Sequence, residues 1–358
     1  MSFFRPKWAF DLRRNPALAE PAPPTESMRP IVEGFRRWCN ALVCLSTLVT
    51  LLVGCKGESS PPSNSVALPT GDSISAPSAP DEGQIVFDRE FVFLSLEADS
   101  LVIVPWFFRA SVMREGVRRE QTAWLSQGGV WEMLGQEIRD TPLTRSPWRI
   151  LPGETIRLIV GTDDQVISLL LRDPPRELET VLGNLMTEWA NPGAESIRLY
   201  RGRTLFPAGP IDGIVMEVSR RWEAADDGDP GDWVFVHSGS DLQFFMEGKR
   251  PVDEPGVPVL YDGWTRVALR DLQWQDLAME WDELRAYESA RRNVPIRWSI
   301  GSPGEEISGS LESVSSHLMV GQGDGPILPL LGLFEVSGVM EVLGQEFSVT
   351  GMIRHVQR

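Results

Sequence analysis

Residues 334–355 read FEVSGVMEVLGQEFSVTGMIRH. The segment contains two runs rich in β-branched and apolar residues, 334–343 and 346–355, which flank Gly344 and Gln345. A short glycine-containing link between two such runs is typical of the tight turn of a β-hairpin. The end of the chain is therefore predicted to be two antiparallel strands joined by a short turn.

The rest of the chain after residue 83 carries the same kind of pattern. Short runs of β-branched, apolar and aromatic residues recur between turn signals. The predicted strands are 84–96, 101–110, 154–160, 165–171, 214–220, 233–238, 242–246, 264–269, 277–284, 296–300 and 307–312. This many strands favour an antiparallel barrel or sandwich and argue against a parallel sheet with alternating helices.

One segment has the spacing of a helix instead. Its apolar residues recur at intervals of three and four, and they are Leu178, Val181, Leu182, Leu185, Met186 and Trp189. Asp173 can cap the first turn, and Asn191 begins an Asn-Pro-Gly sequence that would end the helix. The fold class predicted from the residues is therefore mainly β, as one or more antiparallel barrels or a sandwich, with one amphipathic helix.

Three short elements near the C-terminus carry a family resemblance. They are PIRW at 295–298, FEVSG at 334–338 and VTG at 349–351. Together they resemble the closing section of the carotenoid 1,2-hydratase-like (hydroxyneurosporene synthase-like) lipocalins. The resemblance implies a lipocalin-like fold with two barrel-like halves and an apolar ligand. No residue of this chain matches the catalytic acid of that group.

The N-terminal part has the features of an export signal. Residues 41–52 (ALVCLSTLVTLL) are uncharged and mostly apolar, and Arg36 and Arg37 precede them. A membrane-spanning helix needs about 20 apolar residues, so this stretch fits the core of a signal peptide better. The sequence LVGC at 52–55 resembles the lipobox of bacterial lipoproteins. That resemblance implies cleavage after Gly54 and attachment of lipid chains to Cys55.

These signals divide the chain into three parts. Residues 1–54 are predicted to be the signal peptide, with 1–27 as an extension from a start codon placed too early and Met28 as the expected start. Residues 55–83 are the lipidated cysteine and a flexible tether rich in Ser, Pro and Gly. Residues 84–358 are the β-rich domain. Lys56 follows the cysteine instead of an aspartate, which by analogy predicts a cell-envelope protein on the outer membrane, facing the periplasm.

Charge and cysteine usage exclude several classes of function. The chain has 34 basic and 50 acidic residues, a net charge of −16, and such a surface repels nucleic acid phosphates. We therefore expect no nucleic acid partner. All three cysteines, Cys39, Cys44 and Cys55, precede the β-rich domain. This placement excludes disulfides, thiolate metal sites and a cysteine nucleophile from that domain.

Tryptophan is frequent in the β-rich domain, which holds 11 of the 13 in the chain. One interpretation is a cavity for an apolar or amphipathic small molecule, and the other is packing of the core and of neighbouring strands. The candidate ligand-binding residues are Trp106, Trp148, Arg149, Trp264 and Trp298. Arg149 belongs to a basic cluster at 145–149 that can meet a carboxylate or phosphate head group or pair with neighbouring acids.

No catalytic signature decides whether the protein is an enzyme. The three histidines, His237, His317 and His355, are far apart, so no metal site is predicted, and no motif predicts a cofactor. A hydratase or isomerase would need a buried carboxyl with a raised pKa that faces an apolar cavity, and the candidates are Asp262 and Glu335. A structural or assembly role in the envelope is the third alternative.

Overall fold

The computed structural model describes residues 84–96, 101–162, 165–174, 176–191, 195–223, 231–249 and 259–357. The predicted signal peptide, Cys55 and the predicted tether lie outside these ranges. Within them the chain forms seventeen β-strands and one short 3₁₀ turn, η3 (Glu288–Ala290), with no α-helix. No helix in the described ranges has the length and apolar character needed to cross a membrane.

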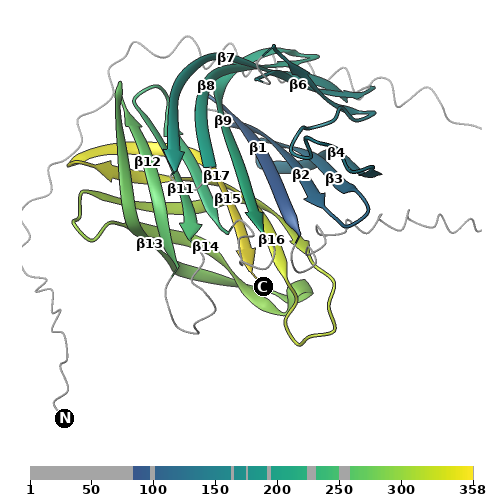
Figure 1. The fold of residues 1–358 in the computed structure, drawn as a ribbon. Helices are drawn as coiled ribbons and strands as arrows, with labels where there is room; N and C mark the ends of the chain where they lie inside the picture. The colour runs from purple at the N-terminus through teal and green to yellow at the C-terminus, as the bar shows by residue number, and fades with distance from the viewer. Residues whose placement is uncertain are drawn as a thin grey trace, which may run out of the picture. The chain divides into compact units, whose positions relative to one another are not determined.

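The first nine strands form one antiparallel sheet (Figure 1). They are β1 (Ile85–Ser95), β2 (Val102–Val112), β3 (Val117–Gln127), β4 (Val130–Thr141), β5 (Ile156–Val160), β6 (Val166–Asp173), β7 (Arg176–Asn191), β8 (Glu195–Phe206) and β9 (Gly209–Glu223). Their order in the sheet is β4-β3-β2-β1-β9-β8-β7-β6-β5, so β4 and β5 are the two edges. The carboxylate of Glu137 on β4 accepts hydrogen bonds from the backbone N–H groups of Thr155 and Ile156, at 2.7 and 2.8 Å. The sheet therefore curls into a barrel-like half whose edges are linked through a side chain.

The last eight strands form a closed antiparallel barrel, drawn in green to yellow in Figure 1. They are β10 (Trp233–Ser238), β11 (Leu242–Lys249), β12 (Leu260–Val267), β13 (Arg270–Tyr287), β14 (Arg292–Gly301), β15 (Ile307–Val320), β16 (Leu330–Val342) and β17 (Gln345–Gln357). Pairing of β10 with β17 closes the barrel. Closure leaves no unpaired edge, which protects the barrel from pairing with other chains.

The C-terminal hairpin predicted from the sequence is confirmed, and its turn lies one residue earlier than predicted. Val342 pairs with Gln345, so the central residues of the turn are Leu343 and Gly344. Both have positive φ, 53° and 78°, as a type I′ turn requires. This turn matches the right-handed twist of the two strands that it connects.

The predicted amphipathic helix is wrong, because residues 176–191 form the long strand β7. Leu178 and Leu182 are buried on one face of β7. The pairing of β7 with β8 then shifts register twice between Leu182 and Thr187, so that Leu185 is exposed while Trp189 is buried. Two irregularities in an alternating strand therefore produced the spacing of three and four that is typical of a helix. In Figure 1, β7 is strongly curved.

Three apolar clusters hold the fold together. One fills the closed barrel and includes Trp298 and Phe334. A second lies inside the curled sheet and includes Phe91 and Trp106. The third lies between the two halves, and it combines residues of β1, β3, β8 and β9 with barrel residues such as Trp264. Since side chains alternate along a strand, β1 supplies one cluster with its odd-numbered residues and the other with its even-numbered residues.

Candidate ligand-binding site

The inner face of the curled sheet presents three parallel rows of side chains across β9, β1, β2, β3 and β4. Residues paired across antiparallel strands carry their side chains on the same face, so the register defines each row. The first row contains Arg221, Phe87, Ala110, Arg119 and Arg139; the second Ser219, Arg89, Phe108, Gln121 and Glu137; the third Glu217, Phe91, Trp106, Ala123 and Gly135. Polar residues predominate in the first two rows, and apolar residues predominate in the third.

A cavity of about 320 Å³ lies along the first two rows. Its volume is at the lower end of the range usual for small-molecule sites. The loop that connects β4 to β5, residues 142–155, covers it. The apolar lining residues are Phe87, Phe108, Ala110, Trp148, Ile150 and Leu151. The rings of Trp148 and Phe87 pack with their centroids 6.1 Å apart, which joins the loop to the sheet.

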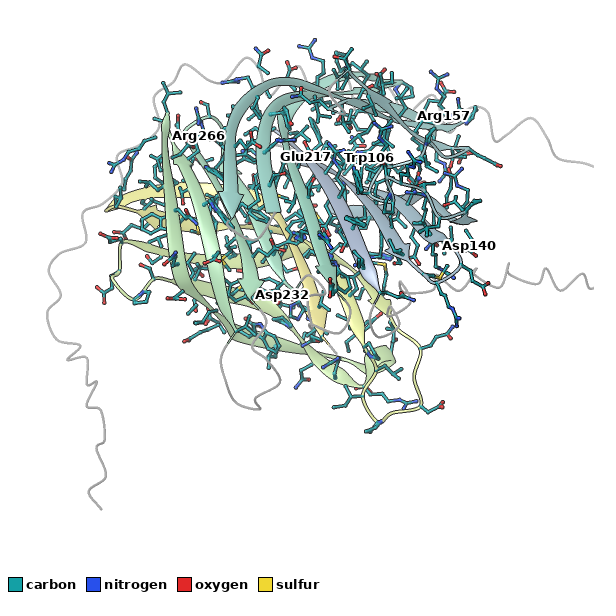
Figure 2. All side chains as sticks on the ribbon, viewed as in Figure 1. Trp106, Asp140, Arg157, Glu217, Asp232 and Arg266 are labelled. Carbon is teal, nitrogen blue, oxygen red and sulfur yellow. The ribbon has the colours of Figure 1, made fainter. Side chains whose placement is uncertain are left out.

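The third row lies deeper inside the curl, and its residues on β9, β1, β2 and β3 are completely buried. Trp106 and Phe91 belong to the apolar cluster of this half, and Glu217 is the charged residue among them. Figure 2 labels Glu217 on β9 and Trp106 on β2. Arg89 Nε donates a hydrogen bond to Glu217 Oε1 at 2.7 Å, and the Tyr200 hydroxyl donates one to Glu217 Oε2 at 2.9 Å. Both carboxylate oxygens are therefore satisfied, as a buried charge requires.

Burial, and next the charge of Glu217, raise the pKa of Tyr200 well above its ordinary value. The phenol therefore keeps its proton at neutral pH and remains a donor to the carboxylate. This makes the group of Glu217, Arg89 and Tyr200 a stable polar structure below the cavity, with the Arg89 guanidinium on the cavity side.

Polar side chains of β3 and β4 hold the loop over the cavity. Arg119 Nη1 donates hydrogen bonds to the carbonyl oxygens of Pro147 and Arg149, at 3.1 and 2.5 Å. Gln121 donates to the carbonyl of Leu151 at 2.6 Å. Arg139 donates to the carbonyl of Pro152 at 2.9 Å. Because loop carbonyls would otherwise need water as a partner, these bonds fix the path of the loop.

Glu137 fixes the end of the same loop. Its carboxylate accepts hydrogen bonds from the N–H groups of Glu154, Thr155 and Ile156 and from the Thr155 hydroxyl, at 2.7–2.9 Å. Partial burial raises the pKa of Glu137, but these four hydrogen bonds outweigh burial and lower the pKa from 4.5 to about 2. Glu137 is therefore ionised at any pH well above 2, and its hydrogen bonds keep the two sheet edges linked at neutral pH.

Arg119 is the most unusual charge of the site. Its side chain is almost fully buried, with 3% of the residue surface exposed. Its hydrogen bonds go to neutral oxygens only, those of Thr141, Pro147 and Arg149, and its Nη2 atom has no hydrogen-bond partner. Burial, and next the charge of neighbouring Arg139, lower the pKa of Arg119. No carboxylate in the described part of the chain forms an ion pair with it.

A second, smaller cavity of about 80 Å³ lies on the opposite face of β1 and β2, toward the closed barrel. Charged residues line it, and Asp88 pairs there with Arg109 at 2.7 Å and accepts a hydrogen bond from Trp222 Nε1 at 2.7 Å. Burial alone would raise the pKa of Asp88, but Arg109 and Trp222 outweigh burial and keep it below its ordinary value. This cavity has room for little more than two water molecules.

The candidate residues chosen from the sequence fall in three different places. Trp148 and Arg149 line the larger cavity, and Trp106 lies beneath it in the third row. Trp264 belongs to the cluster between the two halves, where it stacks on Phe245. Trp298 lies in the core of the closed barrel. The structure therefore brings Trp106, Trp148 and Arg149 together in one half and separates them from the other two.

The two candidate acids lie away from the larger cavity. Glu335 is buried where the halves meet, and its Oε2 atom accepts hydrogen bonds from Ser126 at 2.8 Å and from Ser315 at 3.2 Å. Asp262 is also buried and pairs in register with Glu247 on β11. Neither residue lines the cavity that the aromatic residues form.

His237 and His355 lie on the paired strands β10 and β17, and His317 lies on β15. Among the residues that the structure describes, no group of three metal-ligating side chains comes together. His355 Nδ1 lies 2.6 Å from the Asp232 carboxylate inside the closed barrel, and His317 packs on the ring of Trp124. Burial lowers the pKa of His237 to about 4, so this residue is neutral at physiological pH.

Sequence reasoning did not identify Arg119, Glu137 or Glu217. Their importance depends on which strands are neighbours, and no local spacing records that β9, β1, β2, β3 and β4 form consecutive rows. A signal was present in β3, whose sequence VRREQTAWLSQ places polar residues on both faces. A polar inner face is expected only where a strand lines a cavity or pairs its charges.

A closed antiparallel barrel together with a second, barrel-like sheet defines a lipocalin-like two-barrel protein. The predicted fold class is confirmed in this respect, and the fold agrees with the one that the C-terminal resemblance implies.

Three solved structures are similar to the chain. A protein described as AttH from Nitrosomonas europaea has a TM-score of 0.51 and 12% identity, covering 80% of this chain and 98% of its own. Kievitone hydratase from Nectria haematococca has a TM-score of 0.46 and 13% identity over 81% and 93%, and CghA with Sch210972 has 0.43 and 12% over 76% and 87%. The first match shows a shared fold. No protein-family model and no curated protein sequence matches the chain.

Proposed function

We propose that the protein binds an apolar or amphipathic small molecule in the cavity of its first half. The observation that carries this proposal is the cavity of about 320 Å³ with aromatic and aliphatic walls, held open between the sheet and a hydrogen-bonded loop. Sites of this kind derive affinity from apolar burial and orientation from a few polar groups. Here Phe87, Phe108 and Trp148 supply the walls, and Arg89, Arg119 and Arg221 supply polar groups.

The site supports binding better than acid-catalysed hydration. An acid catalyst needs a carboxyl group with a raised pKa at the cavity. The acidic residues along the cavity are Asp88 and Glu120, and each pairs with an arginine, Arg109 at 2.7 Å and Arg118 at 3.0 Å. The pKa of Asp88 lies below its ordinary value. A proton donor is therefore missing from the described lining, and we place binding ahead of a hydratase function.

Isothermal titration calorimetry of the purified full-length chain with 1-decanol tests the binding proposal. We expect saturable binding, and we expect Trp148→Ala to weaken it about 10-fold, or about 1.4 kcal/mol, because the indole forms one wall of the cavity. Trp281→Ala is the matched control, since Trp281 is also half-exposed but lies on the closed barrel. No binding of 1-decanol or decanoate, or equal weakening by both variants, would contradict the proposal.

We further propose that a lipid anchor at Cys55 attaches this domain to the bacterial envelope, on the periplasmic side of the outer membrane. The support is the apolar stretch at 41–52 followed by LVGC at 52–55. Two or more acyl chains on one residue give stable membrane attachment.

Replacement of Cys55 by alanine in a bacterial host is expected to abolish acyl labelling and to leave the signal peptide uncut. Alkyne-palmitate labelling, electrophoretic mobility and membrane fractionation on a sucrose gradient measure the three consequences. Cys44→Ala is the control, because Cys44 lies within the apolar stretch and outside the LVGC sequence. Unchanged labelling and processing of the Cys55→Ala chain would refute the anchor.

A further inference from the structure

We propose that the ligand of the larger cavity carries an anionic head group, a carboxylate or phosphate, which Arg119 binds while its apolar chain lies along Phe87 and Phe108. This inference rests on the proposed binding function and narrows it to amphipathic acids. Its basis is a buried guanidinium group at the cavity that lacks a counter-charge.

The ion pairs around the cavity distinguish Arg119 from the buried and partly buried arginines Arg89, Arg109 and Arg220. Arg89 pairs with Glu217, Arg109 with Asp88, and Arg220 with Glu90 and Glu247. Arg119 has no such partner among the described carboxylates, although the chain as a whole has a net charge of −16. In a protein with an excess of acidic residues, a buried arginine without a carboxylate is a place where an anion can bind.

The hydrogen bonds of Arg119 leave one of its nitrogen atoms without a partner. Its Nε and Nη1 atoms donate to Thr141 Oγ1 and to two loop carbonyls, whereas Nη2 is buried without any hydrogen-bond partner. A buried polar atom without a partner costs about 1–3 kcal/mol, and more for a charged group. A ligand oxygen at Nη2 would remove this cost and supply the missing negative charge.

The row that contains Arg119 gives the ligand its orientation. Ala110 and Phe87 separate Arg119 on β3 from Arg221 on β9, so an apolar strip of two strands lies between two positive charges. Arg221 is exposed and forms no ion pair with a described carboxylate. It adds positive potential at the rim, where it attracts an anion without binding it tightly. Of these two arginines, Arg119 binds the head group because it is the buried one.

Loop anchoring is the alternative role for Arg119, since it donates to the carbonyls of Pro147 and Arg149. Arg139 allows the two roles to be separated. It pairs with Arg119 across β3 and β4 and donates to the carbonyls of Leu151 and Pro152 in the same loop, but it does not line the cavity. Loss of Arg139 therefore weakens the loop and leaves the guanidinium of Arg119 in place.

The test compares ligands that share one apolar chain and differ in the head group. Calorimetry of the full-length chain with decanoate, decyl phosphate and 1-decanol is expected to show the two anions binding at least 10-fold more tightly than the alcohol. Acetate and inorganic phosphate, which lack the chain, are expected to bind at least 100-fold more weakly than decanoate. Arg119→Met should weaken decanoate binding at least 10-fold more than it weakens 1-decanol binding, because the lost loop hydrogen bonds affect both ligands and the lost charge affects only the anion. Arg119→Lys should retain part of the preference for the anions.

Arg139→Met is the control, and we expect it to change decanoate and 1-decanol binding by the same factor. Equal affinity for the alcohol and the acid, or an equal loss of both in Arg119→Met, overturns the inference and leaves the binding function intact. Tight binding of inorganic phosphate alone also overturns it, because the apolar chain would then play no part. Failure of all the decyl compounds to bind refutes the proposed function itself.

Discussion

Replacement of Arg220 by methionine is expected to lower the free energy of unfolding by about 3–5 kcal/mol, because it removes a buried cation that forms ion pairs with two buried carboxylates. Arg220 lies on β9, and its side chain is 2% exposed. It forms an ion pair with Glu90 on β1 at 3.3 Å and another with Glu247 on β11 of the closed barrel. One guanidinium group therefore neutralises an acid of each half. Guanidinium chloride unfolding at pH 7 measures the effect.

A second substitution separates the charge effect from the loss of packing. Adding Glu247→Gln to Arg220→Met removes one of these two buried negative charges and should recover part of the lost stability. Arg203→Met is the matched control, since Arg203 pairs with Asp212 on the solvent-exposed surface of β8 and β9 and should matter little. If Arg220→Met is as stable as Arg203→Met, the buried pairs do not stabilise the contact between the halves.

Replacement of Gly351 by alanine is expected to destabilise the closed barrel by about 3 kcal/mol, at the upper end of the cost of overpacking. A Cβ atom at this position would lie 2.1 Å from the carbonyl oxygen of Phe235 and 2.7 Å from Cα of Val236. Both contacts are with the backbone of β10, so no change of rotamer relieves them. The β10–β17 pairing that closes the barrel would have to separate locally.

Gly301→Ala provides the comparison for Gly351→Ala. Gly301 also lies in a barrel strand, but a Cβ atom there meets nothing within 4 Å. Alanine at this position should be neutral or stabilise the fold by up to about 1 kcal/mol, because it restricts the unfolded chain. Thermal unfolding of the two variants gives the comparison. Equal midpoints would show that close approach of β10 to β17 does not require glycine.

The closed barrel was largely predictable from the sequence. The predicted strand 233–238 has the same bounds as β10, and the predicted hairpin at 334–355 is β16 with β17. β10 begins with a run of apolar residues that is buried on both faces, and the hairpin has two apolar-rich runs on either side of a glycine-containing turn, so both are visible in the local sequence. The full lengths were not predictable, since β13 continues to Tyr287 through a stretch in which most residues are exposed.

The first half was harder to predict, and the reasons are physical. No strand was predicted over β3, β4 or β8. The cavity-lining face of β3 carries Arg119 and Gln121, and its other face carries Arg118 and Glu120, so the apolar alternation disappears. In β7 the register shifts reproduced helical spacing. Local patterns report burial on one face, and they fail where a strand borders a cavity or bends.

The site was predictable only in part for the same reason. The abundance of tryptophan pointed to an apolar cavity, and Trp148 and Arg149 do line one. Trp264 and Trp298 were chosen for the same abundance of tryptophan, but both pack in apolar cores. Whether a tryptophan faces a cavity or a core depends on which strands are neighbours, and the local sequence does not show this. Arg119 could not be selected from the sequence, because the lack of a neighbouring carboxylate becomes visible only in the folded structure.

The two halves differ in how their circumference is held together, and this has a mechanical consequence. In the described strands, parting the closed barrel anywhere breaks a ladder of backbone hydrogen bonds. Parting the first half between β4 and β5 instead breaks side-chain links, namely the four hydrogen bonds of the Glu137 carboxylate and the exposed ion pair of Glu132 on β4 with Arg176 on β7. We therefore expect the wall of the first half to open between β4 and β5, the line that no backbone ladder closes. A ligand too large for the cavity would then separate β4 from β5, while the closed barrel keeps its shape.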